Sequence, residues 1–529
     1  MNFELPYPSS RSPVMGRNVI ATSQPLAAQA GLLMLARGGT AADAAIAAAM
    51  ALTVVEPTGC GVGSDAFALI WDGEKVQGLN ASGRAPSAWE PSRFADQRSM
   101  AERGWDSVTV PGAVSAWIAL WERYGTLPLD VVADPAIALA RDGFPVSPVI
   151  AILWENGARL LSQQPGFAEE FMPNGKVPKA GEIVRRSQLA TTLEEIVATK
   201  GESFYRGSLA ARIAAHAAEN GGGLALADLE AHSADWVEPI SIPFRDSRIY
   251  EIPPNGQGIA TLIALGLLEP FELEEQPVDS VESLHLMIEA TKLALVDTDR
   301  HVADISAMRI ASGDLLDEGY LASRRKLIDR GSASLPAYGV PRPGGTVYLA
   351  AADAQGRMVS FIQSNYMGFG SGIVVPGTGI SMQNRGAGFS LDTNHPNCVA
   401  PGKRPFHTII PGFATDRDGK AAQMAFGVMG GPMQAQGHLQ MAVRMLAYGQ
   451  NPQAAADAPR WRVIGGRKVA VESTFDPKLA AGLATLGHEI VVEAPDAVFG
   501  FGGAQIIACG EEGYIAGSDP RKDGHAVAF

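Results

Sequence analysis

Thr346 is the residue of this chain whose type and position most clearly suggest chemistry. It follows the Pro/Gly-rich run 341–345 and begins an apolar, β-branched segment. A cut between Gly345 and Thr346 would give Thr346 a free α-amine beside its hydroxyl, and that amine can activate the hydroxyl without a His or Asp partner. Gly345 has no Cβ, so a nucleophile can approach its carbonyl closely. A strand that merely begins with Thr shows the same local pattern, so this segment alone leaves both interpretations open.

The residues after Thr346 predict a β-hairpin that would hold it in place. Residues 346–353 and 357–365 are strand-like and are separated by Ala354-Gln355-Gly356. A glycine-rich stretch follows at 368–379, but it leads into Ile-Val-Val-Pro and not into a helix. This order argues against a dinucleotide-binding loop. Further back, residues 26–52 predict two helices broken at Gly38-Gly39.

Several separated blocks share one order along the chain, and the set is more specific than any single glycine-rich block. The blocks are residues 38–45, 56–67, 346–365, 383–390, 401–408 and 429–434. In order and spacing they resemble the γ-glutamyltranspeptidase family of N-terminal-nucleophile hydrolases, over nearly the whole chain. The resemblance implies an α/β fold, a four-layer αββα sandwich. It also implies self-cleavage of a zymogen into a large subunit, 1–345, and a small subunit, 346–529, which together form one αββα unit.

The same resemblance implies a catalytic set. Thr346 falls on the nucleophile, and the Gly345–Thr346 bond falls on the cleavage site. Ser364 falls where the family has a hydroxyl that bonds the nucleophile. Gly430 and Gly431 fall on the pair whose N–H groups form an oxyanion hole, and two residues without side chains before a helix suit that role. Taken singly, Ser364 also reads as an ordinary strand serine and the glycines as a helix-initiating turn.

The expected carboxylate-binding residues depart from the family pattern. The family has an arginine four residues before a proline, where this chain has Ser82. Arg84 lies two residues further on, and positions two apart in a strand share a face, so Arg84 becomes the candidate carboxylate ligand. The family's paired serines are replaced by His407-Thr408. Arg84, with Lys403-Arg404 and His407 nearby in sequence, keeps the predicted site favourable to anions.

Other departures concern the substrate amine and the size of the site. Gly388 stands where the family has an aspartate for the substrate ammonium. Without that partner a buried ammonium would be costly. Tyr366 replaces an asparagine near the nucleophile, with Asn365 beside it. These changes favour a small carboxylate-bearing amide without an α-amine.

Oxamate fits this description, and the chain resembles the oxamate amidohydrolase branch of the family, which belongs to purine-nitrogen catabolism. The predicted reaction is hydrolysis of oxamate to oxalate and ammonia through a threonine acyl-enzyme. A γ-glutamyltranspeptidase or glutathione hydrolase is the alternative. A non-catalytic binding relative is a more distant one. No cofactor or metal is expected. The subunits are expected to form a heterodimer, with a dimer of heterodimers left open.

Composition supports a large globular enzyme and excludes some partners. The chain has 529 residues, 46% of them hydrophobic, and a net charge of −14. Since residues 346–529 contain 14 basic and 14 acidic residues, the negative excess lies in 1–345. An acidic surface of this kind repels nucleic acid and anionic membranes. Three separated cysteines and the lack of a leader-like N-terminus predict a reducing, cytoplasmic location.

One further cluster resembles a metal site. Asp297, Asp299, His301 and Asp304 lie close together in sequence at the end of the helix predicted over 280–302. Acids and histidines at helix ends are usually solvated, so we expect a structural role for this cluster.

Overall fold

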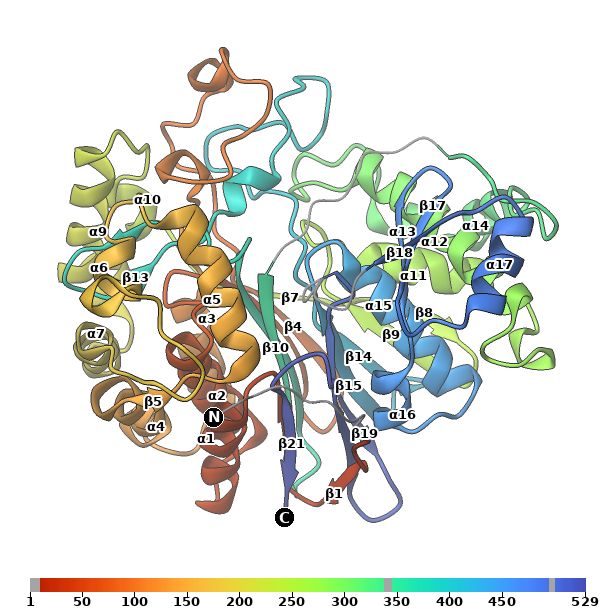
Figure 1. The fold of residues 1–529 in the computed structure, drawn as a ribbon, viewed down its shortest axis with the longest axis horizontal. Coiled ribbons are helices and arrows are strands. Elements are labelled where there is room, and N and C mark those ends of the chain that lie inside the picture. The colour runs from red at the N-terminus through yellow and green to blue at the C-terminus, as the bar shows by residue number, and fades with distance from the viewer. Residues whose placement is uncertain (1–9, 337–344, 494–499) are drawn as a thin grey trace.

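The computed structural model describes residues 10–336, 345–493 and 500–529, so most of the Pro/Gly-rich run before Thr346 lies outside the described residues. Two seven-stranded antiparallel sheets lie face to face between two layers of helices (Figure 1). The first sheet has the order β1 (Val14–Gly16), β20 (Tyr514–Ser518), β19 (Gly503–Cys509), β15 (Ala422–Met429), β14 (Gly412–Asp416), β9 (Ser247–Glu251) and β8 (Ile240–Phe244). The second has the order β21 (His525–Ala528), β2 (Val19–Thr22), β10 (Gly345–Ala352), β11 (Met358–Tyr366), β3 (Asp65–Trp71), β4 (Val76–Asn80) and β7 (Asp235–Val237). The expected αββα architecture is confirmed.

The helices of the first half of the chain cover the outer face of the β10 sheet, on the left of Figure 1. They are α1 (Pro25–Ala36), α2 (Ala41–Val55), α3 (Ala113–Tyr124), α4 (Leu129–Asp142), α5 (Pro148–Leu161), α6 (Phe167–Phe171), α7 (Ser187–Ala198), α8 (Glu202–Arg206), α9 (Ser208–Glu219) and α10 (Leu226–Glu230). Every residue of α2 is buried, and its many alanines allow close packing on the sheet. The α1–α2 break falls at Gly38, whose φ of 84° suits glycine, as the sequence predicted.

The second helical layer covers the outer face of the β15 sheet, on the right of Figure 1. It includes α11 (Gly258–Leu268), α12 (Val281–His301), α13 (Ser312–Leu315), α14 (Glu318–Arg325), α15 (Met433–Ala442), α16 (Pro452–Asp457) and α17 (Pro477–Thr485). A small sheet of β16 (Trp461–Gly465), β17 (Lys468–Glu472) and β18 (Glu489–Glu493) lies beside it. The described residues also form two short strand pairs, β5 (Phe144–Pro145) with β6 (Ile183–Val184) and β12 (Val374–Val375) with β13 (Ile380–Ser381).

Residues from both sides of the Gly345–Thr346 bond interleave in each sheet. In the second sheet, β10 pairs with β2 on one side and β11 pairs with β3 on the other. In the first sheet, β14 pairs with β9. A cut before Thr346 would therefore leave both pieces held by shared sheets and a common core.

Alternation along β10 divides its side chains between two cores. Val347, Leu349 and Ala351 pack toward the helices of the first half, whereas Tyr348 and Ala350 pack between the sheets. Among the described residues, no helix has the length and apolarity that a membrane crossing requires.

Candidate active site

Thr346 lies at the start of β10, fully buried, with two polar side chains at its hydroxyl. Its Oγ1 is 3.1 Å from Ser364 Oγ, and Gln434 Nε2 donates to it over 3.3 Å. Gln434 is oriented in turn by Ile410, whose backbone N–H donates to Gln434 Oε1 at 3.0 Å. The predicted nucleophile and Ser364 therefore come together. The sequence analysis did not predict the contact of Gln434 with Thr346, although Gln434 is the last residue of the 429–434 block.

A break in strand register sets the position of Thr346. Gly345 pairs with Tyr366 and Val347 pairs with Gln363, so Ser364 and Asn365 both lie opposite Thr346. Such bulges re-aim side chains and are frequent beside active sites. Tyr366 has φ of 80°, an unfavourable value for an aromatic residue, and its N–H donates to Ser364 Oγ at 2.8 Å. This bent end of β11 aims the Ser364 hydroxyl at Thr346.

Gly430 and Gly431 form the turn between β15 and α15. Their φ angles are 131° and 60°, in the left-handed region where glycine is favoured. A Cβ on Gly430 would lie 2.9 Å from Gly502 Cα, so this position also requires the absence of a side chain. Gln257 Nε2 donates to Gly431 O at 2.9 Å and also to Thr408 O at 2.5 Å. Gln257 thus joins the glycine turn to the 401–408 block.

A buried arginine lies beside this group. Arg385 begins a short helical turn at 385–388 and donates from Nη1 to Thr408 Oγ1 at 2.7 Å. Its guanidinium carbon lies 4.2 Å from the centroid of the Tyr366 ring. Thr408 and Tyr366, both predicted as substrate-binding residues, therefore contact Arg385. Arg385 belongs to the 383–390 block, but the sequence analysis assigned it no role.

His407 and Asp65 form a second buried pair. His407 Nε2 and Asp65 Oδ2 are 3.1 Å apart, and Gly83 N–H donates to Asp65 Oδ1 at 3.1 Å. Burial raises the pKa of Asp65 to about 7, although the charge of Arg385 opposes the rise. Burial and the neighbouring Arg385 charge hold the pKa of His407 well below its usual value. His407 is therefore neutral at physiological pH, and its ring packs edge-on against Phe67.

Of the other two predicted pocket residues, Asn365 lies opposite Thr346 and is fully buried, whereas Arg84 lies further out. Asn365 accepts from Ser64 Oγ at 2.8 Å and so links β11 to the turn before β3. Arg84 donates to Gly402 O at 3.1 Å and lies 3.5 Å from Asp304 Oδ2, with nearly half of its side chain exposed. Together with Asn80, Asp304 and Arg404 it lines an open cavity of about 620 Å³. Thr346 is not among the residues that line that cavity.

The metal-like cluster at the end of α12, residues 297–304, forms ion pairs and hydrogen bonds within the protein. Asp297 pairs with Arg324 at 2.9 Å, and Asp304 accepts from Ser306 Oγ and from the Arg404 N–H. These contacts account for the burial of both carboxylates and support the structural interpretation.

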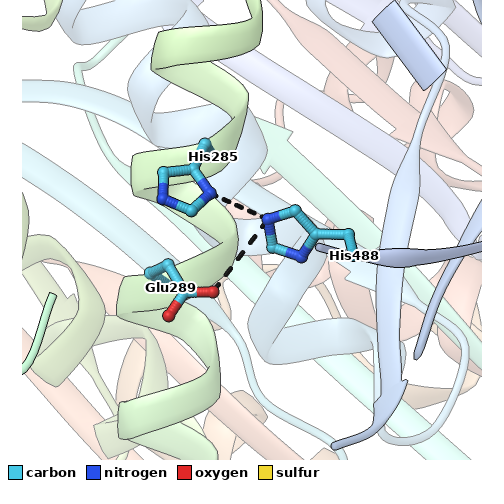
Figure 2. Close-up of side chains that lie close together, drawn as sticks. All are labelled: His285, Glu289 and His488. Carbon is cyan, nitrogen blue, oxygen red and sulfur yellow. Dashed lines mark hydrogen bonds and ion pairs between the residues drawn. The ribbon is translucent and has the colours of Figure 1, made fainter. Parts of the chain in front are cut away.

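A different trio, His285 and Glu289 of α12 with His488 before β18, has its ligand-type atoms within 4.8 Å of one another (Figure 2). The same space contains the Lys292 ammonium, which donates to Glu289 Oε1 at 2.7 Å. His285 Nδ1 and His488 Nε2 lie 2.8 Å apart, and His285 Nε2 is 2.7 Å from Asp329 O. The positive charge of Lys292 disfavours a cation here. We interpret the trio as a buried polar network that links α12 to the small sheet.

Comparison with known proteins places this geometry in context. A family model described as gamma-glutamyltranspeptidase matches residues 27–529. The glutathione hydrolase-like YwrD proenzyme of Bacillus subtilis is 38% identical over 97% of this chain and 100% of that protein. The oxamate amidohydrolase proenzyme of Klebsiella pneumoniae is 36% identical over 95% of this chain and 97% of its own length. The crystal structure of cephalosporin acylase from Bacillus halodurans matches with a TM-score of 0.95 at 47% identity, covering 100% of this chain and 99% of that one.

Proposed function

This chain belongs to the γ-glutamyltranspeptidase family of self-processing hydrolases that act on amides, and we propose that it hydrolyses a small carboxylate-bearing amide, with oxamate as the favoured substrate. The single observation that carries the proposal is the Thr346 hydroxyl at the first strand position, held between Ser364 Oγ and Gln434 Nε2. No other hydroxyl of the chain combines a Gly-Thr bond with such contacts among the described residues.

Maturation uses the same hydroxyl. Thr346 Oγ attacks the carbonyl carbon of Gly345, and the C–N bond breaks as the nitrogen takes a proton and becomes the Thr346 α-amine. The resulting ester is hydrolysed by water, which leaves a carboxylate on Gly345 and restores the hydroxyl. Because the two pieces interleave in both sheets, they stay associated as large and small subunits, 1–345 and 346–529.

The mature site repeats this chemistry on the substrate. The α-amine of Thr346 takes the proton from Oγ, which attacks the amide carbon. The N–H groups of Gly430 and Gly431 stabilise the oxyanion, and the protonated α-amine gives its proton to the departing ammonia. Water, activated by the same amine, then hydrolyses the ester and releases the dicarboxylate. Ser364 and Gln434 orient the hydroxyl throughout.

The pocket favours a small acyl group without an ammonium. A Cβ at position 388 would lie 2.7 Å from Phe406 O, so no aspartate fits there without movement of the backbone. The Tyr366 ring packs against the Arg385 guanidinium and is only 6% exposed, and Tyr366 itself pairs with Gly345, the residue before the nucleophile. A bulky ring at this position favours a small acyl group. The relatives are named for glutathione, oxamate and cephalosporin, so a glutathione-type hydrolase is the alternative.

Substrate preference tests this proposal directly. We expect kcat/KM for oxamate to exceed that for γ-glutamyl-p-nitroanilide by at least about tenfold, equivalent to ~1.4 kcal/mol of transition-state binding. The assay follows ammonia release from oxamate and nitroaniline release from the anilide, both with the cleaved enzyme. EDTA in both assays should leave the rates unchanged. A γ-glutamyl donor that is superior by tenfold would favour the glutathione-type alternative.

The Ser364 hydroxyl supplies a second test. In Ser364→Ala we expect kcat to fall about 10- to 100-fold, as for the loss of a ~1.5–3 kcal/mol hydrogen bond to a charged group, because the developing Thr346 alkoxide loses a donor. Ser360→Ala is the matched control, since Ser360 lies on the same strand and its Oγ is 2.7 Å from the Tyr348 hydroxyl. Steady-state kinetics on both cleaved variants decide the matter, and an equal loss in the two would remove Ser364 from the mechanism.

A further inference from the structure

Arg385 is a buried cation whose hydrogen-bonding capacity is only partly used. Its side chain is 0% exposed, and among the described residues its Nε and Nη2 atoms have no hydrogen-bond partner. Within the described part of the chain, Nη1 alone of the guanidinium nitrogens is engaged, by Thr408 Oγ1. Buried guanidinium donors without acceptors are costly, and buried charges in native proteins are normally paired.

The two unused donors form one edge of the guanidinium, and other arginines of this protein show what that edge binds. Arg521 donates from Nε to Glu472 Oε1 at 2.5 Å and from Nη2 to Glu472 Oε2 at 2.6 Å. Arg245 uses the same two nitrogens on the two carboxylate oxygens of Glu274. This side-on fork holds a carboxylate in a fixed plane.

A chain of contacts links the Arg385 guanidinium to the nucleophile. The Arg385 guanidinium lies against the Tyr366 ring, and the Tyr366 backbone holds the Ser364 hydroxyl that contacts Thr346. On its other side Arg385 bonds Thr408, whose carbonyl shares Gln257 with Gly431. The guanidinium is thus tied on one side to the nucleophile and on the other to the glycine turn.

We propose that the Nε and Nη2 edge of Arg385 binds the substrate carboxylate, and this assignment rests on the proposed hydrolysis of a carboxylate-bearing amide. It makes Arg385 the residue that selects the substrate class. A planar α-oxo acid amide suits this site because its carboxylate is one bond from the carbonyl that Thr346 attacks. Arg84, the candidate from the sequence, instead lies on the separate cavity with Asp304.

The charge of Arg385 is not neutralised by a directly bonded carboxylate among the described residues. Burial lowers its pKa to about 10, so the side chain is still charged at neutral pH. The Tyr366 phenol and the Asp65 carboxyl are the acidic groups whose charge opposes this fall in pKa. Both oxygens of Asp65 already have partners in Gly83 N–H and His407 Nε2. A bound carboxylate would meet the two open donors without displacing any existing bond.

A matched pair of substrates tests the assignment. Oxamide has nearly the shape of oxamate but carries an uncharged amide in place of the carboxylate. In Arg385→Gln we expect kcat/KM for oxamate to fall at least about 100-fold, as when one partner of a buried charged pair is removed, with most of the effect in KM. We expect the rate with oxamide to change less than about threefold. Arg385→Lys keeps the charge but not the fork and should recover only part of the loss.

Two controls separate binding from folding. Each variant must be cleaved into chains 1–345 and 346–529, and Arg385→Gln should melt no lower than wild type because it removes a buried, half-satisfied cation. Arg84→Gln should leave both substrates within about threefold. An equal loss on oxamate and oxamide, or a selective loss of oxamate activity in Arg84→Gln, would overturn the assignment.

Calorimetric titration of oxalate into the cleaved protein keeps this inference distinct from the proposed function. Oxalate should bind wild type and Arg84→Gln but not Arg385→Gln. If oxamate is not turned over and oxalate binding still depends on Arg385, the proposed substrate fails while the carboxylate site stands. If oxalate does not bind wild type, or binds Arg385→Gln equally well, the carboxylate site is refuted.

Discussion

Thr346→Ala is expected to yield an uncut chain of 529 residues without amidase activity. The Ala side chain has no hydroxyl to attack Gly345, and without cleavage no α-amine forms. Both the nucleophile and its base are lost at once, so the rate should fall at least ~10⁴-fold, as for removal of a catalytic nucleophile in other hydrolases. A denaturing gel and an ammonia-release assay measure the two effects.

Two companion variants make this result specific. Thr346→Ser keeps a hydroxyl and should still be cleaved, although more slowly. Thr191→Ala removes an exposed threonine of α7 and should behave as wild type. N-terminal sequencing of the smaller wild-type fragment should begin at Thr346. A fragment that begins elsewhere, or a Thr346→Ala protein that is still cut, would show that the nucleophile is misassigned.

Glu289→Ala should reduce the free energy of unfolding by about 3–5 kcal/mol, the typical cost of breaking a buried ion pair by removing one partner. Glu289 and Lys292 are both fully buried and lie 2.7 Å apart. Without the carboxylate, the ammonium would face Ser334 O at 3.2 Å and His488 Nδ1 at 3.4 Å, with no negative charge in contact. Urea unfolding in the uncut Thr346→Ala background measures the loss.

The double variant Glu289→Ala/Lys292→Met provides the decisive control. Removing both charges should restore much of the stability, because the cost arises mainly from the ammonium left unpaired. Glu318→Ala, which removes a largely exposed partner of Arg325, should cost less than ~1 kcal/mol. If Glu289→Ala is no more destabilising than Glu318→Ala, the buried network does not stabilise the junction of α12 with the small sheet.

Local sequence patterns were sufficient to predict several elements of the fold. The alternation of residues 346–353 and 357–365 predicted β10 and β11, and Gly38-Gly39 predicted the break between α1 and α2. These features depend on residues close together in the chain, so hydrophobic period and turn residues specify them. The candidate nucleophile could be found for the same reason, since a Gly-Thr bond at the head of a strand is itself a local signal.

Tertiary structure decided which side chains surround that nucleophile. Gln434 reaches Thr346 from a helix 88 residues along the chain, and Arg385 of the helical turn 385–388 meets Thr408, 23 residues further on. Neither contact has a local period or spacing that reveals it. Arg84 was chosen from strand alternation, but β4 ends at Asn80, so that alternation does not extend to position 84. The Arg84 side chain instead donates to Gly402 O and lies beside Asp304.

The sequence by itself therefore determined the family, the strand that carries Thr346 and the residue types available for hydrolysis. Only the folded chain showed that Arg385 is buried with its Nε and Nη2 edge unpaired among the described residues. Burial and hydrogen-bond satisfaction depend on every element packed around a group, and here those elements come from both sides of the Gly345–Thr346 bond. That is why the candidate carboxylate ligand could be chosen only from the three-dimensional arrangement.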